Sequence, residues 1–419
     1  MVTVIEKPNL EGVKQAVETL KGVSTVTPLA HSHYLSKKFE CNVILKREDL
    51  QIVRSYKLRG AFNKISTLTK TQQVQGIVCA SAGNHAQGVA FACERLQIEG
   101  TIFMPTTTPK QKLESVSLFG KNKIKVILSG DTFDDCKKEA IAFSKNENKT
   151  FIHPFDDSKI IEGQGTIGLE ILEQSETTID YLLAPIGGGG LAAGLVTVFK
   201  ELSPQTKIIG VEPKLAASMT YALEQGHNAE LDRIEKFVDG AAVKKVGTLN
   251  YAVCKDKISQ MLTVDSGHAC NQLIELYNRE AIVAEPAGVL SICGLEEIRE
   301  KIKGKNVVCI LSGGNNDISR MEEIKEKAAT YRGERHYFLV QFPQRSGALK
   351  EFVLDVLSDN DDIFHFQYIK KHARNFGSAV VGIDIGEAGT FEELKSRMIK
   401  KGFYKDYINE NQALMDVLV

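Results

Sequence analysis

A lysine near the start of a predicted helix is the first side chain in this sequence that suits covalent chemistry. Residues 42–46 alternate as a strand does, and a helical pattern runs from about 56 to 68. Ser55 stands where a helix N-cap would stand, so Lys57 would lie in the first helical turn. The positive helix end there should lower the pKa of the Lys57 amine. Such an amine is suited to bind an aldehyde, although a solvated surface lysine is the ordinary alternative.

Two small-residue loops follow apolar strands further along the chain. The strand at 76–80 leads into Ser-Ala-Gly-Asn at 81–84, and the strand at 181–184 leads into four glycines at 187–190. Four successive glycines between a strand and a helix form a backbone nest that is open to a phosphate. A reactive lysine, a polar loop and a phosphate cradle together suggest pyridoxal phosphate.

The elements that must position these loops form a regular alternation from residue 42 onward. Strands are predicted at 42–46, 76–80, 101–104, 123–128, 181–184, 207–211 and 305–311, and helices at 10–20, 56–68, 110–118, 132–145, 162–173 and 191–201. This alternation predicts α/β architecture, with parallel sheets covered by helices on both faces. Binding sites in such sheets lie at the carboxyl ends of strands, where both small-residue loops stand.

Four segments in this order and spacing resemble threonine dehydratase, a pyridoxal-phosphate enzyme of the tryptophan-synthase-β structural group. They are SYKLRG (55–60), SAGNHAQG (81–88), GGGGLAAG (187–194) and LSGGN (311–315). The resemblance covers most of residues 5–320 and implies two parallel-sheet α/β domains. The C-terminal stretch resembles the regulatory domain of the biosynthetic form, in a short version with a single ACT-like, ferredoxin-like α+β unit.

The resemblance implies a role for each motif. Lys57 would hold pyridoxal 5′-phosphate and act as the catalytic base, and Tyr56 would stack on the ring or pack in the core. Asn84 would contact the 3′-oxygen and Ser312 the pyridine nitrogen. Backbone groups would bind the phosphate at Gly187, Gly188, Gly189, Gly190 and Leu191, and the substrate carboxylate would lie against Ser81, Ala82, Gly83 and Asn84. No divalent metal is expected, because the extra aspartate of serine racemases near Glu212 is missing.

Several of these residues also have ordinary explanations. Asn84 could be a turn residue or a cap, Glu285 could face the cofactor ring or cap a helix, and His85 reads as a helix-start residue rather than a base. Gly188, Gly190 and Ala193 with Glu212 also fit a relaxed dinucleotide fingerprint. A nicotinamide enzyme would, however, leave segments 55–60 and 81–88 without a role.

The composition favours a multidomain protein of the cytoplasm. The chain has 419 residues, a net charge of −1 and eight cysteines without a C-x-x-C pair. Balanced charge gives no case for nucleic acid or a membrane surface, and no apolar run of about twenty residues predicts a membrane span. Scattered cysteines indicate a reducing compartment, and no signal peptide is visible.

The alternation stops near residue 316, which indicates a domain boundary. We expect a catalytic domain at 1–320 with a small subdomain at roughly 55–153, a linker at 321–333 and a regulatory domain at 334–419. The last domain reads as strand 337–342, helix 346–357, strands 363–370 and 378–385, helix 391–401 and a short strand around 413–418. That βαββαβ order predicts a ferredoxin-like unit.

These observations together predict an L-threonine ammonia-lyase that forms 2-oxobutanoate and ammonia, with L-serine as a weaker substrate. A serine racemase or a serine-preferring dehydratase shares the same motifs, and a non-catalytic amino-acid sensor is a third class. The corner at 342–349 resembles an effector site, so isoleucine, or valine, is the expected inhibitor. The domain could instead serve assembly alone. By resemblance the enzyme is a homotetramer.

Overall fold

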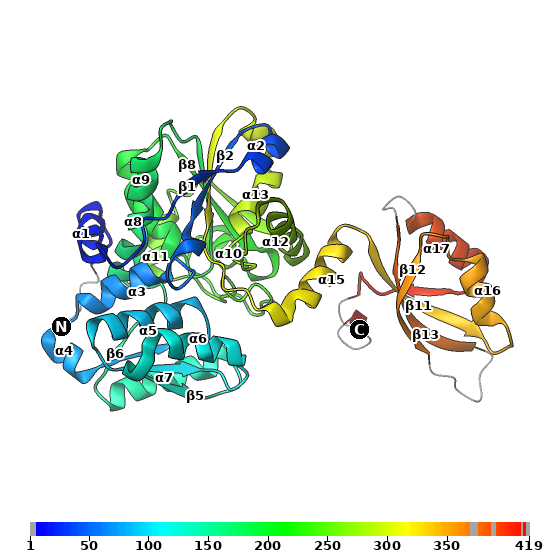
Figure 1. Ribbon diagram of the computed structural model, residues 1–419, viewed down its shortest axis with the longest axis horizontal. Helices are drawn as coiled ribbons and strands as arrows, with labels where there is room; N and C mark the ends of the chain where they lie inside the picture. Colours follow the sequence, from blue (N-terminus) through cyan, green and yellow to red (C-terminus); the bar gives the residue numbers. More distant parts are fainter. Residues whose placement is uncertain (1–5, 369–375, 387–390, 412–413, 416–419) are drawn as a thin grey trace. The chain divides into compact units, whose positions relative to one another are not determined.

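The computed structural model describes residues 6–368, 376–386, 391–411 and 414–415. The chain divides into two compact units, Met1–Ile318 and Ser319–Val419 (Figure 1). Among the described residues, no helix is long and apolar enough to cross a membrane.

The first unit contains two sheets, and the larger has the strand order β1-β2-β10-β7-β8-β9. Its strands are parallel except β1, which pairs antiparallel with β2 at one edge. Apolar runs in the central strands bury both faces, as parallel sheets require. The strands are β1 (Leu29–His31), β2 (Asn42–Arg47), β7 (Tyr181–Pro185), β8 (Lys207–Pro213), β9 (Gln260–Val264) and β10 (Asn306–Leu311).

The smaller sheet is entirely parallel and has the order β5-β4-β3-β6. All seven strands predicted for this unit are present, whereas β1, β6 and β9 were not predicted. β1 and β6 contain three and two residues, too few to give a periodic signal. The strands are β3 (Ile77–Ala80), β4 (Gly100–Met104), β5 (Ile124–Leu128) and β6 (Thr150–Phe151).

Helices cover both faces of the sheets. Helices α8 and α9 lie on one face of the large sheet and α13 lies on the other (Figure 1). Helices α8 and α9 share one apolar core with Leu182 and Ile310, whereas Gly294 of α13 lies against Leu183. The helices of this unit are α1 (Leu10–Leu20), α2 (His33–Phe39), α3 (Lys57–Ser66), α4 (Lys70–Gln75), α5 (Asn84–Leu96), α6 (Lys110–Gly120), α7 (Phe133–Asn146), α8 (Ser158–Gln174), α9 (Gly190–Leu202), α10 (Ser218–Gln225), α11 (Thr248–Cys254), α12 (Ser266–Glu280), α13 (Leu290–Glu297) and α14 (Arg299–Ile302).

Helix α8 lies between α3 and α9 and meets both backbone to backbone. A Cβ atom added to Gly163 would lie 2.7 Å from the Arg59 carbonyl oxygen, and one added to Gly194 would lie 2.6 Å from the Gly165 nitrogen. Such approaches are possible only for glycine. The helix that carries Lys57 and the helix that follows the four glycines are therefore both packed directly on α8.

The second unit is the expected ferredoxin-like fold. It contains a four-stranded sheet of order β12-β13-β11-β14 with antiparallel pairs, and α16 and α17 share a core with its inner face. The segment expected to be a linker contains α15, whose Ile324 and Ala328 are fully buried. The elements of the second unit are α15 (Met321–Tyr331), β11 (Arg335–Pro343), α16 (Ala348–Asp355), β12 (Asp362–Tyr368), β13 (Phe376–Asp384), α17 (Phe391–Lys400) and β14 (Tyr404–Tyr407).

The last strand was predicted in the wrong place. It was expected around 413–418, but β14 lies at Tyr404–Tyr407 and pairs with β11. Tyr404 and Tyr407 pack against the core of this unit, whereas the charged residues between them do not. Residues 414–415 are helical, and 413 and 416–418, like 369–370 of an earlier predicted strand, lie outside the described residues.

Candidate active site

Three loops at the carboxyl ends of parallel strands meet beside the start of α3. The SAGN loop (residues 81–84) follows β3, the glycine loop (residues 187–190) follows β7, and the SGGN loop (residues 312–315) follows β10. The Tyr56 N–H donates to the Ser312 carbonyl at 3.3 Å, and the Gly314 N–H donates to the Arg54 carbonyl at 2.9 Å. These bonds hold the approach to α3 against the SGGN loop.

Lys57 is the first residue of α3, and its amine has a backbone carbonyl rather than a carboxylate as its hydrogen-bond partner. The Ser55 hydroxyl accepts from the Lys57 N–H at 3.3 Å, although Tyr56 occupies the N-cap position. The Lys57 Nζ donates to the Pro154 carbonyl oxygen at 3.2 Å. Burial lowers the pKa of Lys57 to about 8, and Glu285 opposes that shift. The direction of the pKa shift was predicted, but its main cause is loss of solvent rather than the positive helix end.

Asn84 is the middle member of a chain of three hydrogen-bonded side chains, between Asn315 and Glu285. It is the first residue of α5, and its Nδ2 donates to Glu285 Oε1 at 2.6 Å. Its Oδ1 accepts from Asn315 Nδ2 at 2.7 Å. Burial raises the pKa of Glu285 to about 7, and the Asn84 bond opposes that shift. Glu285 therefore faces the site rather than capping a helix.

The glycine loop presents backbone rather than side chains. Gly189 has φ of 89° and is the N-cap of α9, with no side-chain cap on the first amides of that helix. A Cβ atom at Gly188 would lie 2.3 Å from the Phe155 ring, and one at Gly187 would lie 2.8 Å from the Ala241 Cα. Glycine is thus required here by protein neighbours as well as by any anion.

Two adjoining cavities join these loops. The larger, of about 440 Å³, includes Ser81, Ala82 and Gly83 in its lining, and the smaller, of about 20 Å³, includes Tyr56, Gly187 and Ser312. The residues common to both linings are Lys57, Asn84, Gly240 and Glu285. Gly188 lines the larger cavity, whereas Gly189, Gly190 and Leu191 line neither cavity.

Ser312 and Tyr56 lie at the smaller cavity. The Ser312 hydroxyl is buried and has only a long contact, at 3.5 Å, to the Ala287 carbonyl. The Tyr56 ring packs against the core of the large sheet and lies 5.3 Å from the Lys57 Nζ. A buried hydroxyl with so weak a partner is free to bond an acceptor that enters the cavity.

Two residues that could have suggested other chemistry are structural. Glu212 is buried, and its carboxylate accepts from the N–H groups of Met219 and Thr220 at the start of α10. It is therefore not available to a ribose, which removes the dinucleotide interpretation. His85 is buried with its Nε2 3.2 Å from the Ile152 carbonyl, and burial lowers its pKa to about 3. It is a neutral structural histidine at neutral pH.

Sequence reasoning missed two groups that touch the site. Asn315 is visible in the SGGN segment, but nothing local shows that it bonds Asn84. Pro154 contributes only its backbone carbonyl to Lys57, and a carbonyl leaves no signal in the sequence.

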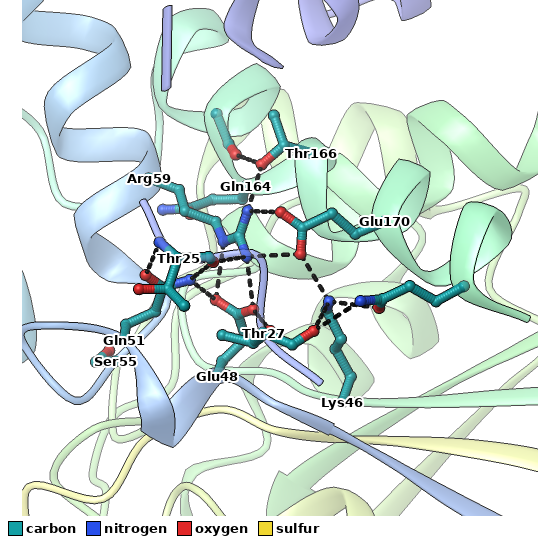
Figure 2. Close-up of polar contacts among 12 residues, drawn as sticks. Thr25, Thr27, Lys46, Glu48, Gln51, Ser55, Arg59, Gln164, Thr166 and Glu170 are labelled. Atoms are coloured by element: carbon teal, nitrogen blue, oxygen red, sulfur yellow. Dashed lines mark hydrogen bonds and ion pairs between the residues drawn. The ribbon is translucent and has the colours of Figure 1, made fainter. Parts of the chain in front are cut away.

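Behind Lys57, a buried cluster of charges surrounds Arg59 (Figure 2). The Arg59 guanidinium donates to both oxygens of Glu48, each at 2.8 Å, and to both oxygens of Glu170, at 2.5 and 2.9 Å. Lys46 donates to Glu170 at 2.6 Å. Two cations thus face two carboxylates, and the cluster joins β2, α3 and α8 without net charge.

The groups around the cavities fit pyridoxal phosphate. Lys57 supplies an amine of lowered pKa for an aldehyde, and the uncapped start of α9 supplies N–H groups for a phosphate. Asn84 and Ser312 supply polar groups for the ring substituents. Within the described residues, no group of three acidic, histidine or cysteine side chains could hold a metal ion.

Comparison with known proteins agrees with this chemistry. The family model described as pyridoxal-phosphate dependent enzyme matches residues 21–313, and the model described as the C-terminal regulatory domain of threonine dehydratase matches residues 326–418. The chain belongs to the pyridoxal-phosphate-dependent enzymes, in the branch that carries the threonine dehydratase regulatory domain.

Relatives that match over the full length of the chain are biosynthetic threonine dehydratases. The chain is 51% identical to L-threonine dehydratase biosynthetic IlvA of Halalkalibacterium halodurans, over 99% of this chain and 100% of the relative. Processed threonine deaminase isoform 2 of Solanum lycopersicum superposes with a TM-score of 0.71 at 40% identity, covering 78% of this chain and 96% of that one. Maize serine racemase superposes with a TM-score of 0.72 at 26% identity, covering 78% of this chain and 99% of that one. The predicted family, fold class and cofactor are confirmed.

Proposed function

We propose that this chain converts L-threonine to 2-oxobutanoate and ammonia, the first step of isoleucine biosynthesis. The observation that carries the proposal is the Lys57 amine, with a pKa lowered to about 8, in a cavity shared with the SAGN, glycine and SGGN loops. The full-length match to biosynthetic threonine dehydratases favours this reaction over serine racemisation.

Each residue of the site has a proposed role toward the cofactor. Lys57 would bind its aldehyde, Asn84 would contact its 3′-oxygen and Ser312 would contact its ring nitrogen. The glycine loop and Leu191 would bind its phosphate, and Tyr56 would lie beside it. When bound, pyridoxal phosphate withdraws electrons from the substrate Cα. The Lys57 amine takes the Cα proton, and a pKa of about 8 keeps part of it neutral for this step. The amides and hydroxyl of Ser81, Ala82, Gly83 and Asn84 hold the substrate carboxylate.

Ammonia release from L-threonine, with and without added pyridoxal phosphate, tests the reaction. We expect cofactor-dependent release of ammonia and 2-oxobutanoate in equal amounts, with slower conversion of L-serine to pyruvate. A chiral assay for D-serine is the matched comparison. Formation of D-serine faster than 2-oxobutanoate would assign the racemase reaction instead.

The regulatory unit is proposed to bind isoleucine at the corner between β11 and α16. Gly347, with φ of 85°, is the N-cap of α16, and no side chain caps the helix. Ser346 precedes the N-cap position, so its hydroxyl does not act as the cap of α16. Uncapped N–H groups at a helix start suit an effector carboxylate. Titration of the full-length enzyme with isoleucine should lower activity, and a flat response to both isoleucine and valine would leave the unit as an assembly element.

Assembly and location are further proposals. We infer a homotetramer from the resemblance to threonine dehydratase alone. We infer a cytoplasmic location because all eight cysteines are buried and unpaired, as a reducing compartment permits. Sedimentation equilibrium of the full chain would give four times the monomer mass. A stable monomer or dimer at all concentrations would contradict the tetramer.

A further inference from the structure

A buried asparagine outside every recognised motif bonds the glycine loop. Asn250 lies in α11, is fully buried, and donates from Nδ2 to the Gly188 carbonyl oxygen at 2.6 Å. The same Nδ2 lies 3.2 Å from the Phe155 carbonyl oxygen. Both neighbours are acceptors, so the amide nitrogen must face them. The Gly247 N–H adds a second bond to the Gly188 carbonyl at 3.0 Å.

These two donors determine which way the glycine loop turns. The Gly188 carbonyl and the Gly189 N–H belong to one planar trans peptide, in which the two groups point in opposite directions. Holding the carbonyl toward α11 therefore directs the Gly189 N–H away from α11. The left-handed φ of 89° at Gly189 then leads into α9, whose first amides have no side-chain cap.

The position of Asn250 is itself fixed by the segment that contacts Lys57. Asp156 accepts from the N–H groups of Thr248 and Leu249, both at 2.9 Å, and so caps the start of α11. Asp156 stands two residues after Pro154, whose carbonyl accepts from the Lys57 amine. One short segment thus links the lysine, the glycine loop and α11.

We propose that Asn250 is a positioning residue for the phosphate of the cofactor, which it serves by fixing the orientation of the Gly188–Gly189 peptide. The proposal rests on the proposed use of the glycine loop as the phosphate site. Asn250 does not touch the phosphate. Its side-chain amide binds the Gly188 carbonyl on the side of α11, so that the N–H groups of the glycine loop can face the phosphate.

The test compares two ligands that differ only in the phosphate. The full-length protein, stripped of cofactor, is titrated with pyridoxal phosphate and with pyridoxal, for wild type, Asn250→Asp and Asn250→Ala. Asn250→Asp keeps the shape but replaces the donor with a carboxylate that faces two carbonyl oxygens. We expect affinity for pyridoxal phosphate to fall about 10- to 100-fold, as loss of a buried hydrogen bond implies. Affinity for pyridoxal should stay within about twofold.

Asn306→Ala is the matched control. Asn306 also donates from Nδ2 to a backbone carbonyl, that of Thr178 at 2.9 Å, but it lies at the start of β10, at the end of that strand opposite the SGGN loop. Equal weakening of both ligands, or of neither, would overturn the proposal, and so would unfolding of both Asn250 variants in a melting experiment. Binding is read without turnover, so failure of the threonine reaction would leave this test intact.

Discussion

Lys57 and Arg59 stand two residues apart in α3, and a helical advance of roughly 200° points them to nearly opposite sides. Arg59 is fully buried between the carboxylates of Glu48 and Glu170 (Figure 2). Burial acts to lower the pKa of Arg59, but Glu48 and Glu170 raise it above its usual range. Lys57 has a backbone carbonyl as its partner, and its pKa falls to about 8.

The difference shows that burial alone does not decide how a cation behaves. Loss of solvent disfavours the charged form on both sides of α3. Two bidentate carboxylates reverse that effect for Arg59, whereas Glu285 only opposes it for Lys57. One helix therefore carries a permanently charged anchor on one side and an amine available for chemistry on the other.

The largest expected effect comes from removing the reactive amine. Lys57→Ala should reduce threonine turnover by at least about 10³-fold, because the covalent attachment and the base are both lost. Steady-state ammonia release measures it. Lys70→Ala, at the exposed start of α4, should be indistinguishable from wild type. Near-normal turnover in Lys57→Ala would contradict the assignment of Lys57 as the reactive side of α3.

Removing the anchor should act on stability. Arg59→Met leaves the buried Glu48 without its ion-pair partner and leaves Glu170 paired with Lys46 alone, which should cost about 3–5 kcal/mol. Hydrogen exchange of the α3 amides should accelerate by roughly 10²- to 10³-fold, while Arg59→Lys should show a smaller change because charge is retained. Arg95→Met, at an exposed position of α5, is the control. Unchanged exchange in Arg59→Met would show that the cluster does not anchor α3.

The pH dependence of Lys57 sharpens the comparison. With a folded-state pKa of about 8, Lys57 loses its proton at a lower pH than an ordinary lysine does. The fraction of Lys57 in the reactive neutral form therefore increases as the pH rises toward 8. In the cofactor-free protein, acylation of Lys57 should rise about tenfold per pH unit below that value and flatten above it. Peptide mass spectrometry against a free N-acetyl-lysine standard measures it. A profile that matches the standard would contradict the lowered pKa.

The smallest effect is expected at Glu285. Its charge raises the pKa of Lys57, so Glu285→Gln should move the acylation profile of Lys57 to lower pH. The shift should be modest, because burial raises the pKa of Glu285 itself to about 7 and it is only partly ionised near neutrality. Glu297→Gln, on an exposed part of α13, should leave the profile in place. A shift to higher pH would show that Glu285 does not act through its charge.

Much of the fold followed from periodicity, since apolar strands and amphipathic helices leave repeated signals. Lys57 was predicted in a first helical turn and is the first residue of α3. The cause of its pKa shift was not predictable, because it depends on what encloses the amine. Partners of Arg59 stand 11 and 111 residues away in sequence, so no local pattern shows the cluster.

The short elements around the site gave the least information. Asn250 lies in a seven-residue helix that no periodic pattern predicts, and its bond to Gly188 joins residues 62 positions apart. Glu212 is the reverse case, in which a sequence pattern suggested a role that the structure does not support. Its spacing fits a dinucleotide fingerprint, but its carboxylate caps α10. Both assignments depend on which way a side chain points.

The packing of α8 has a consequence for the size of ligand that the site accepts. Gly163 and Gly165 let α3 and α9 approach α8 to backbone contact, so the thickness of this 17-residue helix sets the distance between Lys57 and the glycine loop. A ligand must reach from one to the other with its aldehyde and phosphate at the same time. Helix α8 holds no predicted site residue, yet a methyl group added at Gly163 would press on the Arg59 carbonyl and force α3 away from α8, which would change that distance.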